Sequence, residues 1–273
     1  MGNEAVDVAS DTTHAETNPA GKRRASWPWT LYTWTVVLGG LGIGAFFCFF
    51  VGGPAALFGD TQRHVAHRML RLGYGIIVRL LRFRLTVSGL ENLTAAASEG
   101  GVILCPNHQS YADVVYLYAL PLPFKWVVKR ELFWAPFFGP AMRLARYPAI
   151  RRGDAQSAEN LLHTLAGLLA AGENILQFPE GTRSPTGELG GFQSGAARLA
   201  LKSGAPLVPI GVYGTFAILP RHSLMYPARG HVHIHVGPPL TFTEPRPTVR
   251  GLTRALREAV DNARTQAAAR VSD

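Results

Sequence analysis

Cysteine is scarce in this sequence: 273 residues include two, Cys48 and Cys105. Neither lies at the spacing of a metal site, so we expect no disulfide framework and no bound metal. The GxSxG motif that presents the serine nucleophile of many hydrolases is absent as well. The net charge is +9, yet there is no nucleic-acid-binding motif and no basic run interleaved with aromatic residues. The natural partners of such a basic protein are anionic lipid headgroups and phosphorylated substrates.

Charge is absent from residues 25–59, a stretch of thirty-five residues without Asp, Glu, Lys, Arg or His. Aromatic residues of the kind found at membrane interfaces open the stretch: Trp27, Trp29, Tyr32 and Trp34. It begins too late and runs too long for a signal peptide. A single membrane span, a re-entrant hairpin that bends within the glycine-rich 39–44, and a buried core helix all fit this composition.

The neighbouring segments differ sharply from this apolar stretch. Residues 1–26 are polar and aperiodic, and we expect a disordered tail there. Residues 63–83 combine apolar residues with five arginines in the pattern of a cationic amphipathic helix. Such a helix lies along a membrane surface or covers the protein's own core. We therefore predict a membrane-associated helical segment over 27–83.

From residue 84 onward, short apolar runs alternate with helical patterns. Predicted strands occupy 84–88, 101–105, 125–128, 175–178, 207–213 and 231–236, and predicted helices occupy 112–120, 133–144, 155–171, 196–203 and 249–269. Alternation of this kind predicts an α/β fold, with a mostly parallel central sheet flanked by helices. We expect one domain over 84–273.

The first candidate site follows the predicted strand 101–105. His108 stands in the loop after this strand, and Asp113 falls in the first turn of the next helix. Open α/β sheets bind ligands at the carboxyl ends of their strands. A histidine can take a proton from a hydroxyl group and return it, and a carboxylate on the other ring nitrogen would hold its tautomer. The pair by itself is equally compatible with ordinary loop polarity.

The second candidate site follows the predicted strand 175–178 and reads FPEGTRS over 178–184. Gly181 permits a tight turn whose N–H groups converge on an anion. Arg183 offers a bidentate fork for phosphate oxygens. Glu180 either orients that arginine or binds a substrate hydroxyl, and the residues alone do not choose. A turn stabilised by an exposed ion pair is the alternative interpretation.

Three histidines, His231, His233 and His235, alternate along the predicted strand 231–236 and therefore share one face. Three histidines on one face are able to bind zinc or copper. We expect this strand to lie at the edge of the sheet, and no fourth ligand is evident. We therefore predict no metal site here.

Together, the two candidate sites resemble the glycerolipid acyltransferase family, whose bacterial example is 1-acylglycerol-3-phosphate acyltransferase. The first block of that family, Asn-His-x4-Asp, is matched by Asn107, His108 and Asp113. Another block, Phe-Pro-Glu-Gly-Thr-Arg-Ser, is matched at every position of 178–184. The resemblance covers about residues 84–240.

Three further stretches extend the resemblance. A Lys-x-Glu-Leu stretch begins at Lys129, and a Val-Pro-Ile strand lies at 208–210. The family's aliphatic-Asp-Arg block reads Ile150-Arg151-Arg152 here. Arg152 holds the matching arginine, whereas Arg151 replaces the usual acid, which puts acceptor recognition at this block in doubt.

The resemblance implies acyl transfer without a covalent enzyme intermediate. His108 would deprotonate the sn-2 hydroxyl of 1-acyl-glycerol-3-phosphate, and Asp113 would hold His108 in place. Residues of the matched blocks would bind the acceptor: Asn107, Lys129, Arg152, Glu180, Gly181, Thr182 and Arg183. The oxyanion would be stabilised by Lys129 or by a backbone amide. No cofactor is expected, because the thioester of acyl-CoA or acyl carrier protein is already activated.

The implied partners are a membrane lipid acceptor, the thioester donor and the membrane surface, but no nucleic acid. The implied location is the cell inner membrane, with an acyltransferase domain over 84–273 that faces the cytoplasm. Other functions remain open: an acyltransferase for another lyso-lipid, such as lyso-ornithine lipid or a lysophospholipid, an acyl-thioester hydrolase, or a catalytically silent lipid-binding protein.

Overall fold

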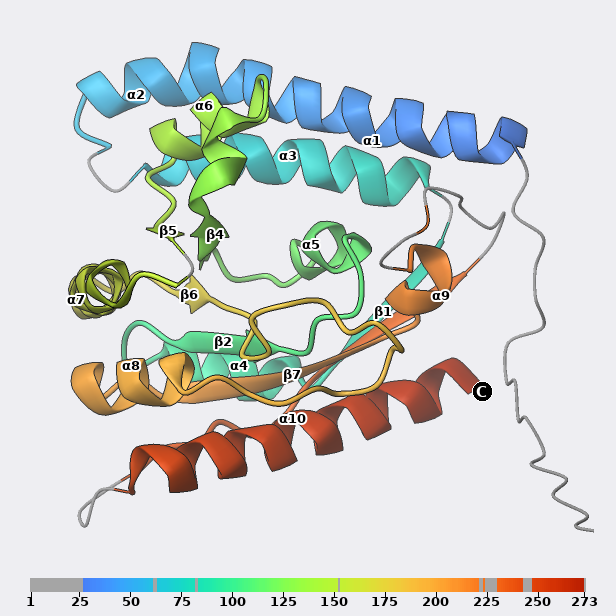
Figure 1. The fold of residues 1–273 in the computed structure, drawn as a ribbon. Coiled ribbons are helices and arrows are strands. Elements are labelled where there is room, and N and C mark those ends of the chain that lie inside the picture. The colour runs from blue at the N-terminus through green and yellow to red at the C-terminus, as the bar shows by residue number, and fades with distance from the viewer. Residues whose placement is uncertain are drawn as a thin grey trace, which may run out of the picture.

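The computed structural model describes residues 27–60, 63–81, 83–151, 153–220, 223, 230–242 and 247–272. The predicted disordered tail 1–26 and the predicted substrate-binding residue Arg152 lie outside these ranges. The described chain forms a central sheet with helices on both faces and a layer of two long helices above it (Figure 1).

The central sheet has six strands, in the spatial order β1 (Arg84–Ser88), β8 (His231–Val236), β7 (Leu207–Tyr213), β2 (Ile103–Pro106), β6 (Ile175–Leu176) and β3 (Lys125–Trp126). Strand β8 runs antiparallel to β7, and every other pairing is parallel. The mostly parallel sheet predicted from the alternating pattern is therefore confirmed. A separate parallel pair consists of β4 (Val128–Lys129) and β5 (Ala149–Ile150).

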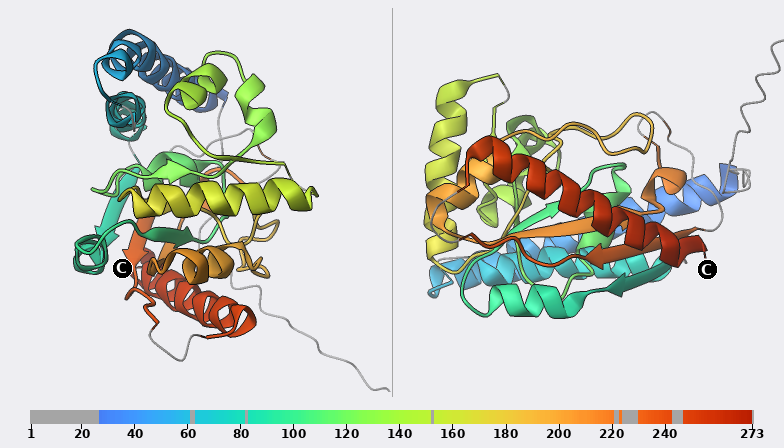
Figure 2. Two further views of the ribbon diagram at one scale, coloured as in Figure 1. Left: turned by 90° about the vertical axis from the view of Figure 1, so that its left-hand side faces the viewer. Right: turned by 90° about the horizontal axis from the view of Figure 1, so that it is seen from below.

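Alternating side chains of the buried strands feed two apolar cores. In β7, Val208, Ile210 and Val212 point into one core, and Leu207 points into the other. Helices α3 (His64–Leu80), α4 (Leu90–Ala97) and α5 (Ala112–Leu117) cover the first face, while α7 (Ala155–Ala170), α8 (Gly195–Ser203) and α10 (Val249–Ser272) cover the second. Two further views show this layered arrangement from the side and from below (Figure 2).

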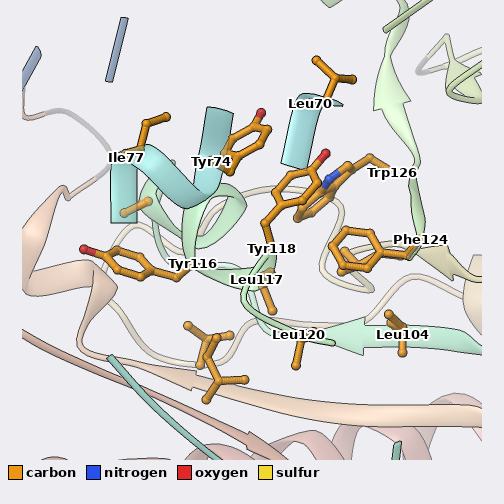
Figure 3. Close-up of a cluster of buried hydrophobic side chains, with 14 of the residues drawn as sticks. Leu70, Tyr74, Ile77, Leu104, Tyr116, Leu117, Tyr118, Leu120, Phe124 and Trp126 are labelled. Atoms are coloured by element: carbon orange, nitrogen blue, oxygen red, sulfur yellow. The ribbon is translucent and has the colours of Figure 1, made fainter. Parts of the chain in front are cut away.

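Helix α3 is held to the sheet by a cluster of large buried side chains (Figure 3). Tyr74 stacks on Tyr118 with 4.0 Å between ring centroids, and Leu70 and Ile77 of the same helix are buried in the cluster. Full burial of each such aliphatic side chain contributes about 1.5–3 kcal/mol. The amphipathic pattern of 63–83 thus covers the protein's own core along one side of the helix.

Within the uncharged stretch, Trp27–Leu57 forms one continuous helix. Helix α1 (Trp27–Phe47) passes through the π-helical turn η1 (Cys48–Gly52) into α2 (Gly53–Leu57). The bend considered for 39–44 is wrong, because α1 runs through these glycines without a break. Trp27–Leu57 is long and apolar enough to cross a membrane, judged by length and composition.

The glycines of α1 serve close packing instead of a bend. Gly40 and Gly44 lie against Gly73 of α3, where a Cβ added to Gly73 would overlap the Gly40 carbonyl oxygen. Small residues let two helix backbones approach in this way. Tyr32 donates a 2.8 Å hydrogen bond from its hydroxyl to the Leu80 carbonyl. Helix α3 therefore returns beside α1 along most of its length (Figure 1).

The observed helices differ from the predicted ones in two ways. The helix predicted over 133–144 is split into a 3₁₀ turn, η2 (Arg130–Trp134), and α6 (Phe138–Leu144). Pro136 lies between them, and its missing N–H and fixed φ interrupt the helix. The short helices α4 and α9 (Thr215–Ile218) were not predicted.

Strand β8 lies inside the sheet and not at its edge, which corrects the prediction for the histidine strand. Its polar face is satisfied by β1: the Thr86 hydroxyl lies 2.8 Å from His231 Nε2 and 2.6 Å from His233 Nδ1. The Ser88 hydroxyl lies 2.8 Å from both His233 Nε2 and His235 Nδ1. The alternating polar residues thus mark a side-chain ladder between two paired strands. No group of three metal-ligating side chains occurs among the described residues.

Candidate active site

His108 and Asp113 meet where β2 ends and α5 begins. The Nδ1 atom of His108 lies 2.8 Å from Asp113 Oδ2. The same carboxylate oxygen accepts the backbone N–H groups of Gln109 and Ser110, at 2.8 and 2.9 Å. An ionised carboxylate only accepts hydrogen bonds, so Nδ1 carries the proton and Nε2 is left as the basic nitrogen. The hydrogen bond expected between this pair is present.

The imidazole of His108 is also held by its face. The Phe178 ring stacks on it with 3.7 Å between centroids and 13° between planes. Phe178 in turn contacts Trp126, whose ring centroid lies 5.7 Å away. The carboxylate fixes one edge of the imidazole and the aromatic stack fixes its plane, so Nε2 has little freedom to turn away.

Glu180 joins the two candidate sites through backbone groups. One carboxylate oxygen accepts the His108 N–H at 2.7 Å, and the other accepts the Gly190 N–H at 2.9 Å. Burial raises the pKa of this carboxyl group, although both hydrogen bonds favour the ionised form. Neither alternative drawn from the sequence describes these contacts. Glu180 holds the loop of His108, and its predicted contact with the acceptor glycerol stays a prediction.

Asn107 is only 1% exposed and is not among the residues that line the cavity beside His108. Its side-chain amide donates to the Val212 carbonyl at 3.0 Å, and its oxygen accepts the Val212 N–H at 2.7 Å. Both bonds continue the pairing of β2 with β7 beyond the end of the strand. In this structure the Asn107 side chain serves the backbone of β7, and the substrate-binding role expected for it stays a prediction.

The turn over 178–184 packs directly against the His108 loop, and the Ser184 N–H donates to the His108 carbonyl at 2.8 Å. Gly181 adopts φ +67°, the left-handed region that glycine occupies without strain. The Gly181 N–H closes the turn on the Phe178 carbonyl at 3.1 Å, so this amide serves the turn. Thr182 is exposed beside it and lines the cavity.

Arg183 lies over the ring of Tyr111, with 3.5 Å between its guanidinium carbon and the ring centroid. Tyr111 belongs to the first block, so this cation–π contact holds the predicted phosphate-binding arginine beside His108. The aromatic residue at position 111 was not singled out from the sequence. Its place three residues after the histidine was the one available signal.

A cavity of about 1050 Å³ connects these residues with the helical layer. Its polar part is lined by His108, Lys129, Thr182 and Arg183, and its apolar part by side chains of α1, α3, α6 and α7, including Trp34, Tyr74, Phe138 and Leu162. A deep apolar space that ends at a few convergent polar groups is typical of a ligand site. An apolar lining of this kind suits a hydrocarbon chain.

Comparison with known proteins places this site in a family. The sequence model of the Acyltransferase family matches residues 84–213. A 1-acyl-sn-glycerol-3-phosphate acyltransferase of Chlamydomonas reinhardtii is 31% identical over 231 residues, which cover 84% of this chain and 67% of the relative. The chain belongs to the glycerolipid acyltransferase family. The hydrogen-bonded residues of the site, from Asn107 to Val212, lie within the matched range of this family member.

Other relatives of this acyltransferase family member support the assignment. A chloroplast 1-acyl-sn-glycerol-3-phosphate acyltransferase of Arabidopsis thaliana is 33% identical over 190 residues, or 70% of this chain and 53% of the relative. The chain thus spans about half the length of that protein. The crystal structure of the acyltransferase PlsC from Thermotoga maritima has the same fold, with a TM-score of 0.70, 20% identity, and coverage of 88% of this chain and 95% of that chain.

Proposed function

We propose that this chain transfers a fatty acyl group from acyl-CoA or acyl carrier protein to the sn-2 hydroxyl of 1-acyl-glycerol-3-phosphate, which yields phosphatidic acid for phospholipid synthesis. The names of its relatives support this substrate class. The observation that carries the proposal is the 2.8 Å hydrogen bond between His108 and Asp113 at the polar end of the cavity.

The reaction requires one base and a firm alignment of two substrates. His108 Nε2 takes the proton of the acceptor hydroxyl as its oxygen attacks the thioester carbonyl. The C–S bond then breaks, and the imidazolium returns the proton to the departing thiolate. Asp113 stabilises the imidazolium between these steps. A thioester needs no further activation, so we propose that neither a metal nor a redox cofactor takes part.

Acceptor recognition follows from the charges at the polar end. Arg183 and Lys129 both line the cavity, and an arginine fork matches phosphate oxygens. Thr182 of the turn lines the cavity as well and offers a hydroxyl donor. We propose that these three side chains bind the phosphate of the acceptor, with Arg152 as a fourth from outside the described residues.

We further propose that residues 27–83 act as the membrane-associated segment of an acyltransferase domain over 84–273, on the cytoplasmic side of the inner membrane. The outer side of the long helix exposes large apolar side chains: Leu31, Leu38, Phe46, Phe50, Leu57 and Phe58. Helix α3 is packed along α1 and its Arg71 donates to the Leu120 carbonyl of the main domain at 2.7 Å. If α1 crossed the bilayer perpendicular to its surface, α3 beside it would have to enter the bilayer with charged residues such as Arg71. This favours a long helix that lies in the membrane interface.

The test is an assay of the purified chain with a matrix of acyl donors and lyso-lipid acceptors, read out by the lipid product. We expect phosphatidic acid from 1-acyl-glycerol-3-phosphate and much slower turnover with a phosphate-free lyso-lipid. His108→Ala should abolish transfer and leave membrane association unchanged.

Three results would contradict the proposal. Equal use of an acceptor without phosphate would remove the role of Arg183 and favour another lyso-lipid as substrate. Release of free fatty acid in the absence of any acceptor would favour a thioester hydrolase. Undiminished turnover by His108→Ala would exclude the proposed base.

A further inference from the structure

Residues 132–138, from η2 to the first residue of α6 and here called the loop 132–138, expose apolar side chains to an unusual extent. Trp134 is 79% exposed, Phe137 is 76% exposed and Leu132 is 44% exposed. Phe133 and Phe138 of the same loop pack against the core, so some of its aromatic residues face the protein interior and the others face outward. Soluble proteins rarely expose a contiguous apolar patch of this kind without a partner for it.

The backbone of this loop is strained at the exposed phenylalanine. Phe137 has φ +60° and ψ −48°, and the Phe138 N–H donates to the Pro136 carbonyl at 2.6 Å. This is a γ-turn of the strained, positive-φ form, which only glycine adopts at low cost. Neither burial nor backbone preference accounts for a phenylalanine here. A partner outside the folded chain would account for it.

The loop lies beside the apolar helix and beside the cavity. The Cys48 thiol of η1 contacts the Ala141 carbonyl of α6, and α6 is drawn against α1 and α2, on the far side of the sheet from α10 (Figure 1). Leu132 and Phe138 line the same cavity as Trp34 of α1 and the catalytic His108. The loop therefore lies next to the long apolar helix and supplies part of the cavity wall.

Basic residues lie near the exposed Trp134 in space and in sequence. The Arg143 guanidinium lies 5.2 Å from the Trp134 ring centroid, and Lys129 and Arg130 precede the loop as exposed residues. Tryptophan next to basic side chains suits the boundary between acyl chains and anionic headgroups. The charge pattern and the position next to α1 both favour a lipid bilayer as the occupant of this patch.

We propose that the loop 132–138 inserts into an anionic lipid surface and forms the rim over which the lyso-lipid passes into the cavity. This inference rests on the proposed function and adds a second lipid-contacting element to the long helix. Phe137 and Trp134 are the inserted side chains, and Leu132 and Phe138 form the inner side of the rim.

The experiment compares the wild type with Phe137→Gly and with the double variant Trp134→Ala/Phe137→Gly. Val249→Ala serves as the control, since Val249 is an exposed apolar residue at the start of α10, across the sheet from α1 (Figure 1). Each protein is assayed with long-chain 1-acyl-glycerol-3-phosphate in vesicles that contain phosphatidylglycerol, and with a short-chain acceptor below its micelle concentration. Vesicle flotation and the thermal unfolding midpoint are measured in parallel.

The expected result is a loss confined to the vesicle acceptor. The double variant should lose at least about tenfold in rate with that acceptor, since two large apolar side chains no longer leave water. Turnover of the short-chain acceptor should not change. Phe137→Gly should keep or raise the unfolding midpoint, because glycine relieves the strained turn. The control should match the wild type throughout.

Three outcomes would overturn the inference. An equal loss with both acceptors would mean that the loop shapes the site itself. No loss with either acceptor would mean that the loop does not touch lipid. A wild-type oligomer that dissociates in the double variant without vesicles would mean that a second copy of the chain covers the patch. If the wild type acylates neither acceptor, the proposed function fails instead, and flotation still tests the loop.

Discussion

Glu180 offers the sharpest test of how the site is held together. In the variant Glu180→Gln, one side-chain oxygen remains as an acceptor, but the amide nitrogen meets a backbone N–H of His108 or Gly190 that it cannot bond. One buried hydrogen bond to a charged group is lost, and a donor is left without a partner. The neutral side chain avoids part of the desolvation cost that raises the pKa of this carboxyl group.

The net effect on stability combines these opposing terms. A hydrogen bond to a charged group contributes about 1.5–3 kcal/mol, and relief of desolvation offsets part of it, so we expect a loss of about 2 kcal/mol. For a chain of this size that corresponds to a fall of about 4–8 °C in the unfolding midpoint. Because the His108 loop loses one of its anchors, we expect kcat to fall by about tenfold to a hundredfold, the range that a misplaced base produces.

The assay separates loop positioning from substrate contact. Initial rates over a range of acceptor concentrations give kcat and KM, and a thermal melt in detergent gives the unfolding midpoint. We expect kcat and the midpoint to fall while the KM for the acceptor changes little. An unchanged midpoint together with a raised KM would refute this reasoning and would restore the contact between Glu180 and the acceptor glycerol.

Two further predictions concern Tyr111 and the three histidines of β8, His231, His233 and His235. Tyr111→Ala should raise the KM for the phosphate-bearing acceptor about two- to thirtyfold, which corresponds to the loss of one cation–π contact with Arg183. Tyr111→Phe keeps the ring and should leave the KM unchanged. An equal effect of both variants in steady-state assays would exclude the contact. Burial lowers the pKa of His231, His233 and His235. The unfolded chain therefore binds more protons below about pH 6.5, and stability should fall as the pH drops through this value. Denaturant midpoints at pH 7.5 and 5.5 should differ more for the wild type than for a triple His→Gln variant, and parallel pH profiles would contradict this.

Patterns that depend on neighbours in the sequence were readable without the structure. The buried strand Leu207–Tyr213 and the strand His231–Val236 have the predicted bounds, because a continuous apolar run and a strict alternation are local signals. The pairing of His108 with Asp113 was expected mainly through the family resemblance, because the spacing by itself also fitted ordinary loop polarity.

Partners that lie far apart along the chain were decided by the tertiary structure. Asn107 bonds the backbone of Val212, and Glu180 bonds that of His108, and no side-chain pattern marks an amide N–H as a future partner. Alternation on the histidine strand indicated one polar face, but the same pattern occurs at a sheet edge and opposite a strand that supplies hydroxyl groups.

The helical layer shows the same division. Composition marked 25–59 as one uncharged apolar stretch, but it left a straight helix and a bent hairpin both open. Its relation to the rest of the chain depends on glycine-lined packing against α3, which no local signal encodes. Local patterning thus determined the elements and the chemistry of the blocks, whereas the orientation of the helix, the strained loop beside it and the backbone anchors of the site arise from contacts that exist only after the chain has folded.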